Sequence, residues 1–434
     1  MKQLTRLFIP ICLETLFYML SGMVDTLMLS AVGDYAVGAV GTANSYIGIF
    51  IIMFSIISSG MVSVMTQNIG AGRPGVAYQA RQLGLLFNAV AGVLMAVFLF
   101  SGAGAILRMV GIADALYEPA LIYLKIVGGG CILNAVIPIF SSYLRAFGYT
   151  KQPLYATIVG NIANFVMNAV FLFVLHKGVA GVAAATVISK ILNLCIVLYF
   201  SHKLISAKNS TERIANKTVL GQIVKVGLPS ACETALYNVA MMLVIRFLNQ
   251  MDAEGLNVTA RSYTATISNF SYCVGAALAQ ANAIMTGWHI GAGKLEECDR
   301  GTKRAAFVGV CVAVCMETAI VLGSGFIMPL FTDNPEMTAL VRKLLAIDIV
   351  LEIGRVTNLV FGQALKTSGD AVFPAVIAAV FMFVFAVGGT WLFGISMGLM
   401  AVGAYIGLAS DECVRAVGMV WRWKTGKWRT KKLV

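Results

Sequence analysis

Charged residues are scarce in this chain of 434 residues. Only 12% of them are Asp, Glu, Lys or Arg, while 59% are hydrophobic, against roughly 25% and 45–50% in an average soluble domain. Histidine is scarcer still: the three histidines lie far apart in sequence, near the ends of hydrophobic stretches. A catalytic site gathers several titratable groups in one place, so a membrane-bound enzyme is a disfavoured alternative.

Paired cysteines are also lacking. The nine cysteines form no C-x-x-C pair and no His/Cys cluster, and most of them sit inside hydrophobic stretches. Neither a disulfide framework nor a structural metal site is expected, and no cofactor is implied. The formal net charge of +12 could suggest a nucleic-acid partner, but in a membrane protein the distribution of Lys and Arg matters more than their total, so we expect no nucleic acid.

The chain is instead rich in long hydrophobic stretches, which recur from one end to the other. A bilayer core about 30 Å thick takes about 20 helical residues to cross. The stretches predict an all-α integral membrane protein with twelve transmembrane helices. The expected spans are residues 7–30, 39–66, 84–107, 119–143, 153–175, 179–201, 220–248, 256–286, 304–327, 338–363, 371–394 and 398–421.

Basic residues alternate with these spans. The N-terminus, every second connection and the tail after residue 421 carry most of the Lys and Arg residues, whereas the other connections hold only Arg108, Lys177, Arg342 and Lys343. The positive-inside rule therefore places both termini in the cytoplasm. We expect a multi-pass protein of the cell (inner or plasma) membrane, surrounded by lipid.

Three short motifs occur twice, in the same order and 219–221 residues apart. Each half of the chain holds six expected spans, so both halves begin on the same side of the membrane. Parallel repeats of this kind are a transporter architecture, with the substrate site between the halves. We predict two pseudo-symmetric six-helix lobes, an amino-terminal lobe of residues 1–209 and a carboxy-terminal lobe of residues 210–434 with a basic cytoplasmic tail. The motifs are Pro10-x3-Glu14-Thr15-x2-Tyr18 with Pro229-x3-Glu233-Thr234-x2-Tyr237, Ile69-Gly70-Ala71-Gly72-Arg73 with Ile290-Gly291-Ala292-Gly293-Lys294, and Leu144-Arg145-x2-Gly148 with Leu365-Lys366-x2-Gly369.

The repeated Gly-Ala-Gly motifs follow long hydrophobic helices and precede basic residues. A phosphate-binding loop would fit the glycines and the positive charge, but the Walker spacing and a strand–helix setting are both missing. We therefore expect tight turns between helices.

The first expected helix carries a stripe of polar side chains. Glu14, Tyr18, Ser21 and Asp25 recur at spacings of four, three and four residues, so they share one face. Inserting an ionisable side chain at mid-bilayer costs at least about 2.5–3.5 kcal/mol, so such a residue usually has a charge partner or a function. Asp25 either bonds a neighbouring helix near the membrane edge or carries a proton or cation, and we favour the carrier.

The fifth and sixth expected helices carry neutral polar groups at the same kind of spacing. Asn161, Asn164 and Asn168 share one face of the fifth helix, and Thr186 lies on the sixth. Such amides either hold helices together, at about 0.6–2 kcal/mol a bond, or line a cavity. The two interpretations stay equally open for Asn161.

The second half repeats the first only in part. Glu233 and Tyr237 match Glu14 and Tyr18, but Val244 stands where Asp25 would be. Coupling is therefore expected mainly in the first half.

The tenth expected helix adds Asp348, Glu352 and Arg355 at spacings of four and three, with Asn358 beyond. Glu352 and Arg355 can form an ion pair on one face, and a structural pair is favoured over a transport role. The charged residues of the ninth and twelfth helices are given no transport role: Glu317, Asp411, Glu412 and Arg415.

Several motifs together resemble the multidrug and toxic compound extrusion (MATE) family, in its prokaryotic type. They occur in the same order along nearly the whole chain. They are Met23-Val24-Asp25-Thr26, Gln67-Asn68-Ile69-Gly70-Ala71-Gly72, Ala180-Gly181-Val182-Ala183, Leu228-Pro229, and Arg355-x2-Asn358 ahead of Leu365-Lys366-x2-Gly369-Asp370.

The resemblance implies a V-shaped fold of two lobes and secondary active antiport by alternating access. Entry of protons or sodium would drive export of small molecules, namely organic cations or other amphipathic drugs. A flippase for a lipid-linked precursor, from the same wider superfamily, is the alternative, but it would be expected to have a more cationic central cavity. The protein is expected to act as a monomer.

The resemblance also implies site residues. In similar prokaryotic members an Asp on the first helix sits with polar groups of helices 5 and 6, here Asp25, Asn164, Asn168 and Thr186, with sodium as a candidate ion at Asp25. Asn168 departs from the pattern, since an Asp is common there. Other members use acids on helices 7 and 10, for which Glu233 and Glu352 are the nearest matches. The substrate cavity is expected to be lined by Glu14, Tyr18, Ser21, Asn161, Tyr237, Arg355 and Asn358.

Overall fold

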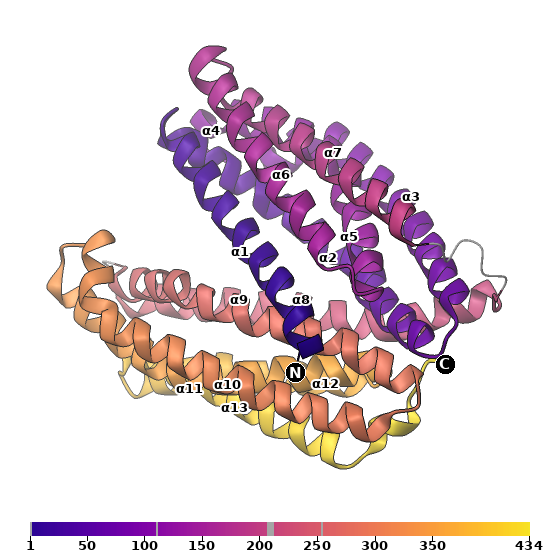
Figure 1. The fold of residues 1–434 in the computed structure, drawn as a ribbon. Coiled ribbons are helices and arrows are strands. Elements are labelled where there is room, and N and C mark those ends of the chain that lie inside the picture. Colours follow the sequence, from indigo (N-terminus) through magenta and orange to yellow (C-terminus); the bar gives the residue numbers. More distant parts are fainter. Residues whose placement is uncertain (1, 110–111, 206–211, 253–254) are drawn as a thin grey trace. The chain divides into compact units, whose positions relative to one another are not determined.

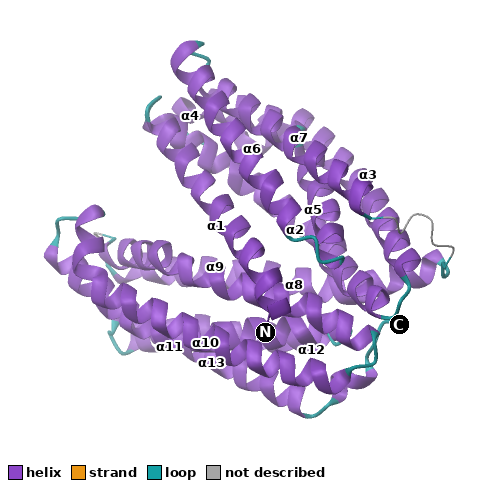
Figure 2. Ribbon diagram, in the orientation of Figure 1, coloured by secondary structure: helices purple, strands orange, loops and turns teal. Residues whose placement is uncertain are grey.

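The structure is a computed structural model that describes residues 2–109, 112–205, 212–252 and 255–434. Within these residues it is almost entirely helical and contains no strand (Figure 2). The chain divides into two compact units, Met1–Gly227 and Leu228–Val434. The lobe boundary that we expected at residue 209 lies outside the described residues.

The first unit contains six membrane-length segments (Figure 1). The fourth segment consists of two helices that are bent by 41° at Gly130, where three successive glycines weaken the helix. The sequence had predicted one uninterrupted helix there. The helices are α1 (Lys2–Ser30), α2 (Asp34–Gly70), α3 (Pro74–Met109), α4 (Asp114–Gly129), α5 (Cys131–Ala146), α6 (Lys151–Ala169) and α7 (Gly178–Leu204).

The second unit also contains six segments, and the first turns of its first helix belong to the first unit. There the backbone of Ile223 packs so closely on Gly60 that a side chain on Gly60 would collide with it. The helices are α8 (Asn216–Met251), α9 (Leu256–Gly291), α10 (Leu295–Ile327), α11 (Pro335–Ser368), α12 (Val372–Phe381) and α13 (Met400–Lys424). The two units together confirm the all-α class and the twelve expected segments.

Hydropathy separates these segments into two groups. Eight described helices are long and apolar enough to cross a membrane, or nine when the bent α4–α5 pair counts as one span. The remaining long helices, α9, α11 and α13, lie in the second unit and carry more polar residues. Polar groups in a span face other helices or a cavity rather than lipid, so these three helices point to a polar interior in the second unit.

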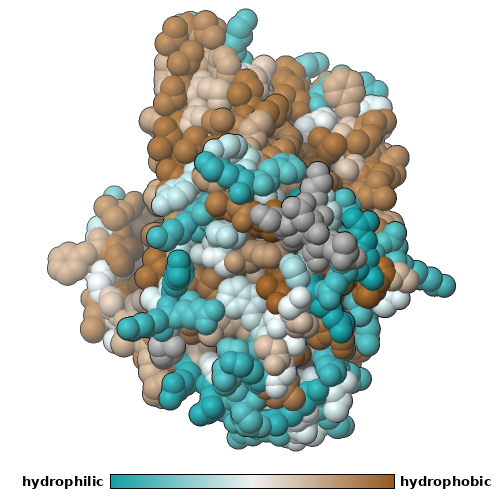
Figure 3. All heavy atoms as spheres, turned by 45° about the vertical axis from the view of Figure 1, so that its right-hand side comes forward, coloured by the Kyte–Doolittle hydropathy of each residue, from teal (hydrophilic) through white to brown (hydrophobic). Residues whose placement is uncertain are grey.

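The outer flanks of the helices suit a lipid environment. Figure 3 shows hydrophobic side chains, in brown, along the helices in the upper part of the view. Large apolar side chains remain highly exposed, among them Leu27, Leu94, Phe307 and Phe326. So much exposed apolar surface is unusual for a soluble monomer and is what a bilayer accommodates.

The Gly-Ala-Gly motifs form matching turns in the two units. Gly72 and Gly293 have φ of +76° and +73°, a left-handed conformation that glycine adopts without strain. Arg73 N–H donates to Asn68 C=O and Lys294 N–H to His289 C=O, each at 2.8 Å. This six-residue bond satisfies a carbonyl that the helix end would leave unpaired. The predicted tight turns are confirmed.

A second matching feature is a π-helical continuation of the fifth segment in each unit. Residues Val170–Val174 continue α6, and Met382–Val387 with Thr390–Ser396 continue α12. π-helical turns widen the helix locally and often occur at functional sites. In the first unit this irregularity begins two residues after Asn168.

Candidate cation and substrate sites

The first unit encloses a polar cavity of about 630 Å³ among α1, α2, α4, α5, α6 and α7. This volume falls within the range of about 300–1,000 Å³ that is typical of small-molecule sites. Seven residues predicted from the sequence line it: Glu14, Tyr18, Ser21, Asp25, Asn161, Asn164 and Thr186.

Asp25 lies at one end of the polar stripe of α1, against the fifth segment. Asn168 Nδ2 donates to Asp25 Oδ1 at 2.8 Å and to Asn164 Oδ1 at 3.1 Å. Asn168 is fully buried, and its own Oδ1 makes no hydrogen bond within the described residues. The structure thus brings together Asp25, Asn164 and Asn168, and it leaves oxygen atoms there that can accept a proton or contact a cation.

Lys190 on α7 is a basic residue of this neighbourhood that was not among the site residues expected from the sequence. Its Nζ donates to Asn134 Oδ1 at 2.8 Å, and it lines the same cavity as Asp25, within range of electrostatic interaction. Its place in a helical stripe with Thr186 was the only signal in the sequence. A positive charge here stabilises Asp25 as a carboxylate, because opposite charges favour the ionised forms of each other.

Glu14 sits at the other end of the stripe, eleven residues before Asp25 and thus about 16 Å away along the helix. It forms an ion pair with Arg145 of α5 at 2.5 Å. Asn161 of α6 donates to Phe17 C=O at 2.9 Å, so for this residue the helix-joining role and the cavity-lining role occur together. The α1 stripe that lines the cavity therefore carries an ion pair at one end and Asp25 at the other.

The second unit has its own polar cavity, of about 470 Å³, lined mainly by α8, α9, α11 and α13. Tyr237, Arg355 and Asn358, expected in the substrate cavity, line it together with Glu233. Glu233 Oε2 lies 2.7 Å from Lys366 Nζ. Glu233 therefore has a cationic partner of its own.

Two arginines form ion pairs with acids in and beside this cavity. Arg355 pairs with Glu352, as predicted from their spacing, and its Nε lies 3.7 Å from Glu412 Oε1. Arg415 lies 2.7 Å from Asp411 and 2.8 Å from Glu412, so these three residues of α13 form a local cluster. The Arg355–Glu412 contact joins α11 to α13, where Gly354 packs directly on the backbone of Cys413.

Two six-helix units, each with a polar cavity inside a lipid-compatible exterior, define a membrane transport protein of the parallel-repeat type. The MatE family model matches residues 10–170 and 229–392, once in each half. The chain belongs to the MatE family and is a transporter, not an enzyme.

Individual relatives cover almost the entire chain. The uncharacterized transporter YisQ of Bacillus subtilis is 32% identical over 428 residues, which are 97% of this chain and 94% of that protein. The probable multidrug resistance protein NorM of Thermotoga maritima is 20% identical over 446 residues, covering 100% and 94%. A crystal structure of a MATE in complex with MaD3S aligns with a TM-score of 0.87 at 20% identity, covering 99% of this chain and 97% of that one. At this identity the likeness shows the fold.

Proposed function

We propose that this protein is a secondary active antiporter that exports organic cations or other amphipathic drugs in exchange for protons or sodium. The observation that carries the proposal is the polar cavity of the first unit, with Asp25 bonded to Asn168 at its end. The relative described as a probable multidrug resistance protein supports drug export.

Coupling in this proposal depends on competition for Asp25. As a carboxylate, Asp25 attracts an entering proton or sodium ion as well as a cationic drug. Binding of one of them lowers the affinity of Asp25 for the other. A ligand shifts a conformational equilibrium only by its differential affinity for the two states. Exchange follows when the ion favours the state that releases the drug and the drug favours the other state.

The departure at Asn168 bears on the coupling ion. Asn168 supplies a neutral amide where a second carboxylate is common, so Asp25 is the only acid of the described residues in this cavity besides Glu14, which is paired with Arg145. A single carboxylate with Lys190 nearby offers little negative charge for a metal cation. We therefore infer proton coupling in the first unit.

A flippase for a lipid-linked precursor is the second transporter candidate, and its anionic headgroup would call for free basic residues in the cavities. Six bases among the described residues line the two cavities. Four of them, Arg145, Lys366, Arg355 and Arg415, are engaged by acids, while Lys190 donates to an amide and Arg261 contacts a sulfur. The charge distribution therefore favours cationic over anionic cargo.

The coupling ion can be measured directly. Purified protein is reconstituted in proteoliposomes that are loaded with ethidium, a fluorescent organic cation. The proteoliposomes are given an inward-directed proton gradient, an inward-directed sodium gradient or neither. We expect export under the proton gradient. Export that is equal in all three conditions would contradict antiport, and export under the sodium gradient alone would contradict proton coupling.

We further propose that the protein resides in the cell membrane with both termini in the cytoplasm, in line with its Lys and Arg distribution, and that one chain is the working unit. Cysteine labelling from outside the cell tests the orientation. In a variant whose nine native cysteines are replaced by serine, a single cysteine introduced next to Arg342 should react with a membrane-impermeant maleimide, and one in the tail should not.

A further inference from the structure

One face of α13 changes from apolar to aromatic to basic as the helix ends. Val417, Trp421 and Lys424 follow one another at spacings of four and three residues and are all exposed, so they share this face. Val417 is 70% exposed and Trp421 is 58% exposed. Tryptophan is enriched where a helix leaves the bilayer core, at the level of the lipid headgroups. Lys424, one turn beyond Trp421, therefore lies at the membrane surface.

The chain after α13 folds back onto the helix. It turns at Gly426, whose φ is +71°, and forms a short 3₁₀ helix, Lys427–Thr430. The indole of Trp428 stacks on that of Trp423, with ring centroids 4.2 Å apart, and Trp428 Nε1 donates to Trp423 C=O at 3.0 Å. Both indoles are almost completely buried. We call residues 422–434 the docked tail.

Two ion pairs fix the docked tail to neighbouring helices. Arg422 donates to both carboxylate oxygens of Asp370, directly after α11, at 2.7 and 3.2 Å. Arg429 Nη1 donates to Glu296 Oε1 of α10 at 2.6 Å. With the stacked indoles, these contacts hold the tail in one conformation. A surface that is ordered in advance loses less conformational entropy when it binds a partner.

The lysines of the docked tail are exposed and carry uncompensated charge. Among the described residues, the acids that pair with the tail engage Arg422 and Arg429, and the tail itself contains no Asp or Glu. The exposed lysines are Lys424, Lys427, Lys431 and Lys432.

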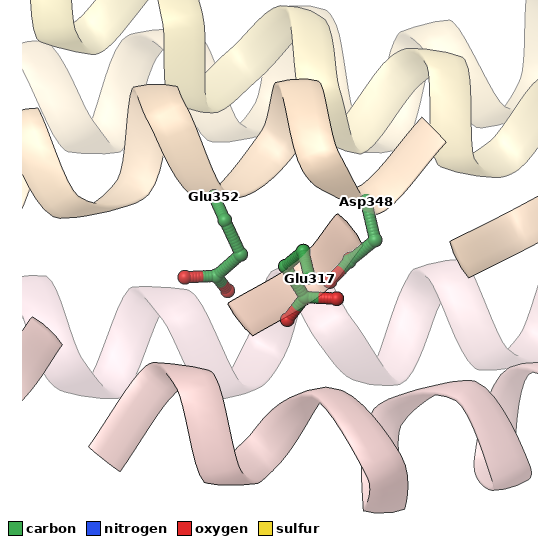
Figure 4. A group of neighbouring side chains, drawn as sticks. All are labelled: Glu317, Asp348 and Glu352. Carbon is green, nitrogen blue, oxygen red and sulfur yellow. The ribbon is translucent and has the colours of Figure 1, made fainter. Parts of the chain in front are cut away.

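Several acids of the second unit lie in its interior, where they cannot balance this charge. Glu317, Asp348 and Glu352 are buried, with one carboxylate oxygen from each within 4.8 Å of the others, and Figure 4 shows the three side chains together between the helices. Glu352 precedes Ser368, the last residue of α11, by about 24 Å along the helix. This separation exceeds the Debye length of about 8 Å at physiological salt.

We propose that the docked tail, together with Trp421, is a binding surface for the headgroups of anionic phospholipids, whose phosphates contact the four exposed lysines. Clusters of basic residues directly beyond a transmembrane helix attract anionic lipid. Lipid is favoured over a soluble acidic partner because the lysines follow directly on Trp421, at the level of the headgroups. The inference concerns the surrounding lipid, and it holds or fails independently of the cargo and of the coupling ion.

The test measures lipid binding without transport. The full-length protein in neutral detergent is titrated with phosphatidylglycerol in mixed micelles, and in parallel with phosphatidylcholine, sodium phosphate or polyglutamate. Thermal unfolding reports binding, because a ligand of the native state raises Tm as it saturates. We expect a saturable rise in Tm with phosphatidylglycerol alone, and a weaker effect at high salt. Replacing the four exposed lysines by glutamine should raise the half-saturating fraction of phosphatidylglycerol about tenfold.

A matched control removes the same number of exposed bases from the first unit. This variant is Lys2→Gln/Arg6→Gln/Arg73→Gln/Lys151→Gln, and it should respond to phosphatidylglycerol as wild type does. Equal weakening by the two sets of substitutions would mean that the lipid responds to total charge, and it would overturn the assignment to the tail.

Trp428→Ala tests the docked conformation with all the lysines in place. It removes the stacking on Trp423 and should weaken the binding of phosphatidylglycerol, whereas Trp428→Phe keeps an aromatic ring there and should restore it. The proposal would be overturned if the alanine variant binds as wild type does, or if phosphatidylglycerol gives no saturable effect. A response to sodium phosphate or polyglutamate that equals the response to phosphatidylglycerol would also contradict it, because the ligand would then be a free anion or an acidic protein.

Discussion

Arg145 Nη2 lies 2.5 Å from Glu14 Oε1, joining the first and fourth segments of the first unit. The second unit contains the same connection, with Lys366 Nζ lying 2.7 Å from Glu233 Oε2. All four residues belong to motifs that recur 219–221 residues apart. The internal repeat therefore preserves a particular ion pair between helices, and not only the order of hydrophobic segments.

We expect Glu14→Gln to destabilise the protein. It leaves the guanidinium of Arg145 without its partner, in a place where the two side chains are only 17% and 13% exposed. Removing one member of a fully buried pair costs about 3–5 kcal/mol, and the partial exposure here should keep the loss below that range. Thermal unfolding in detergent measures it.

The double variant Glu14→Gln/Arg145→Gln serves as the control, because removing both charges should restore part of the loss. A double-mutant cycle with no coupling energy would mean that the pair does not stabilise the unit.

Alanine substitutions at a glycine of a Gly-Ala-Gly turn and at a glycine inside a helix should have opposite effects on stability. Gly293→Ala places a side chain at φ +73°, which costs roughly 1–2 kcal/mol because the left-handed region is unfavourable for L-residues. Gly301, in the helical interior of α10, has no heavy atom within 4 Å of a built Cβ. Gly301→Ala should therefore stabilise the helix by about 0.5–1 kcal/mol. The Tm of Gly293→Ala should fall and that of Gly301→Ala should rise, and equal shifts would argue against the turn assignment.

Asn168 is expected to position Asp25. Asn168→Leu keeps the approximate size of the side chain but removes the donor that lies 2.8 Å from Asp25 Oδ1. Loss of a group that orients a ligand typically costs about 10–100-fold, and we expect a reduction of that order in ethidium export. Asn168→Asp should retain export and shift it toward dependence on sodium, because it adds a carboxylate to the site. Unchanged export by the leucine variant would remove Asn168 from the mechanism.

The segments were predictable from sequence because a transmembrane helix is identified by the length and the hydropathy of its residues. Even α9, α11 and α13, which are less hydrophobic than the other long helices, were expected at these places. The break at Gly130 and the π-helical turns after α6 and α12 were not expected, because they depend on local packing that hydropathy does not record. The prediction that the polar residues of α1 share one helical face was correct, because the spacing of residues along a helix alone determines which face they occupy.

Partners between helices were much harder to foresee. The pairing of Glu352 with Arg355 follows from a spacing of three, but the pairing of Glu233 with Lys366 crosses between helices far apart in sequence. Glu317 was passed over for the same reason: alone on its helix it shows no pattern, and only the packing of α10 against α11 brings it to Asp348. The role of Lys190 near Asp25 likewise became visible only once α7 was placed beside α1.

Export by the Asp25→Asn variant tests the central claim most directly. The substitution keeps the size of the side chain and its contact with Asn168, but it removes the acid that would carry the coupling ion. Wild type and variant are reconstituted at equal protein density, and ethidium export is followed under an imposed proton gradient. We predict that the variant inserts and folds as wild type does and exports ethidium at no more than the background rate of empty liposomes, whereas export at the wild-type rate would contradict the assignment of Asp25 as the coupling residue.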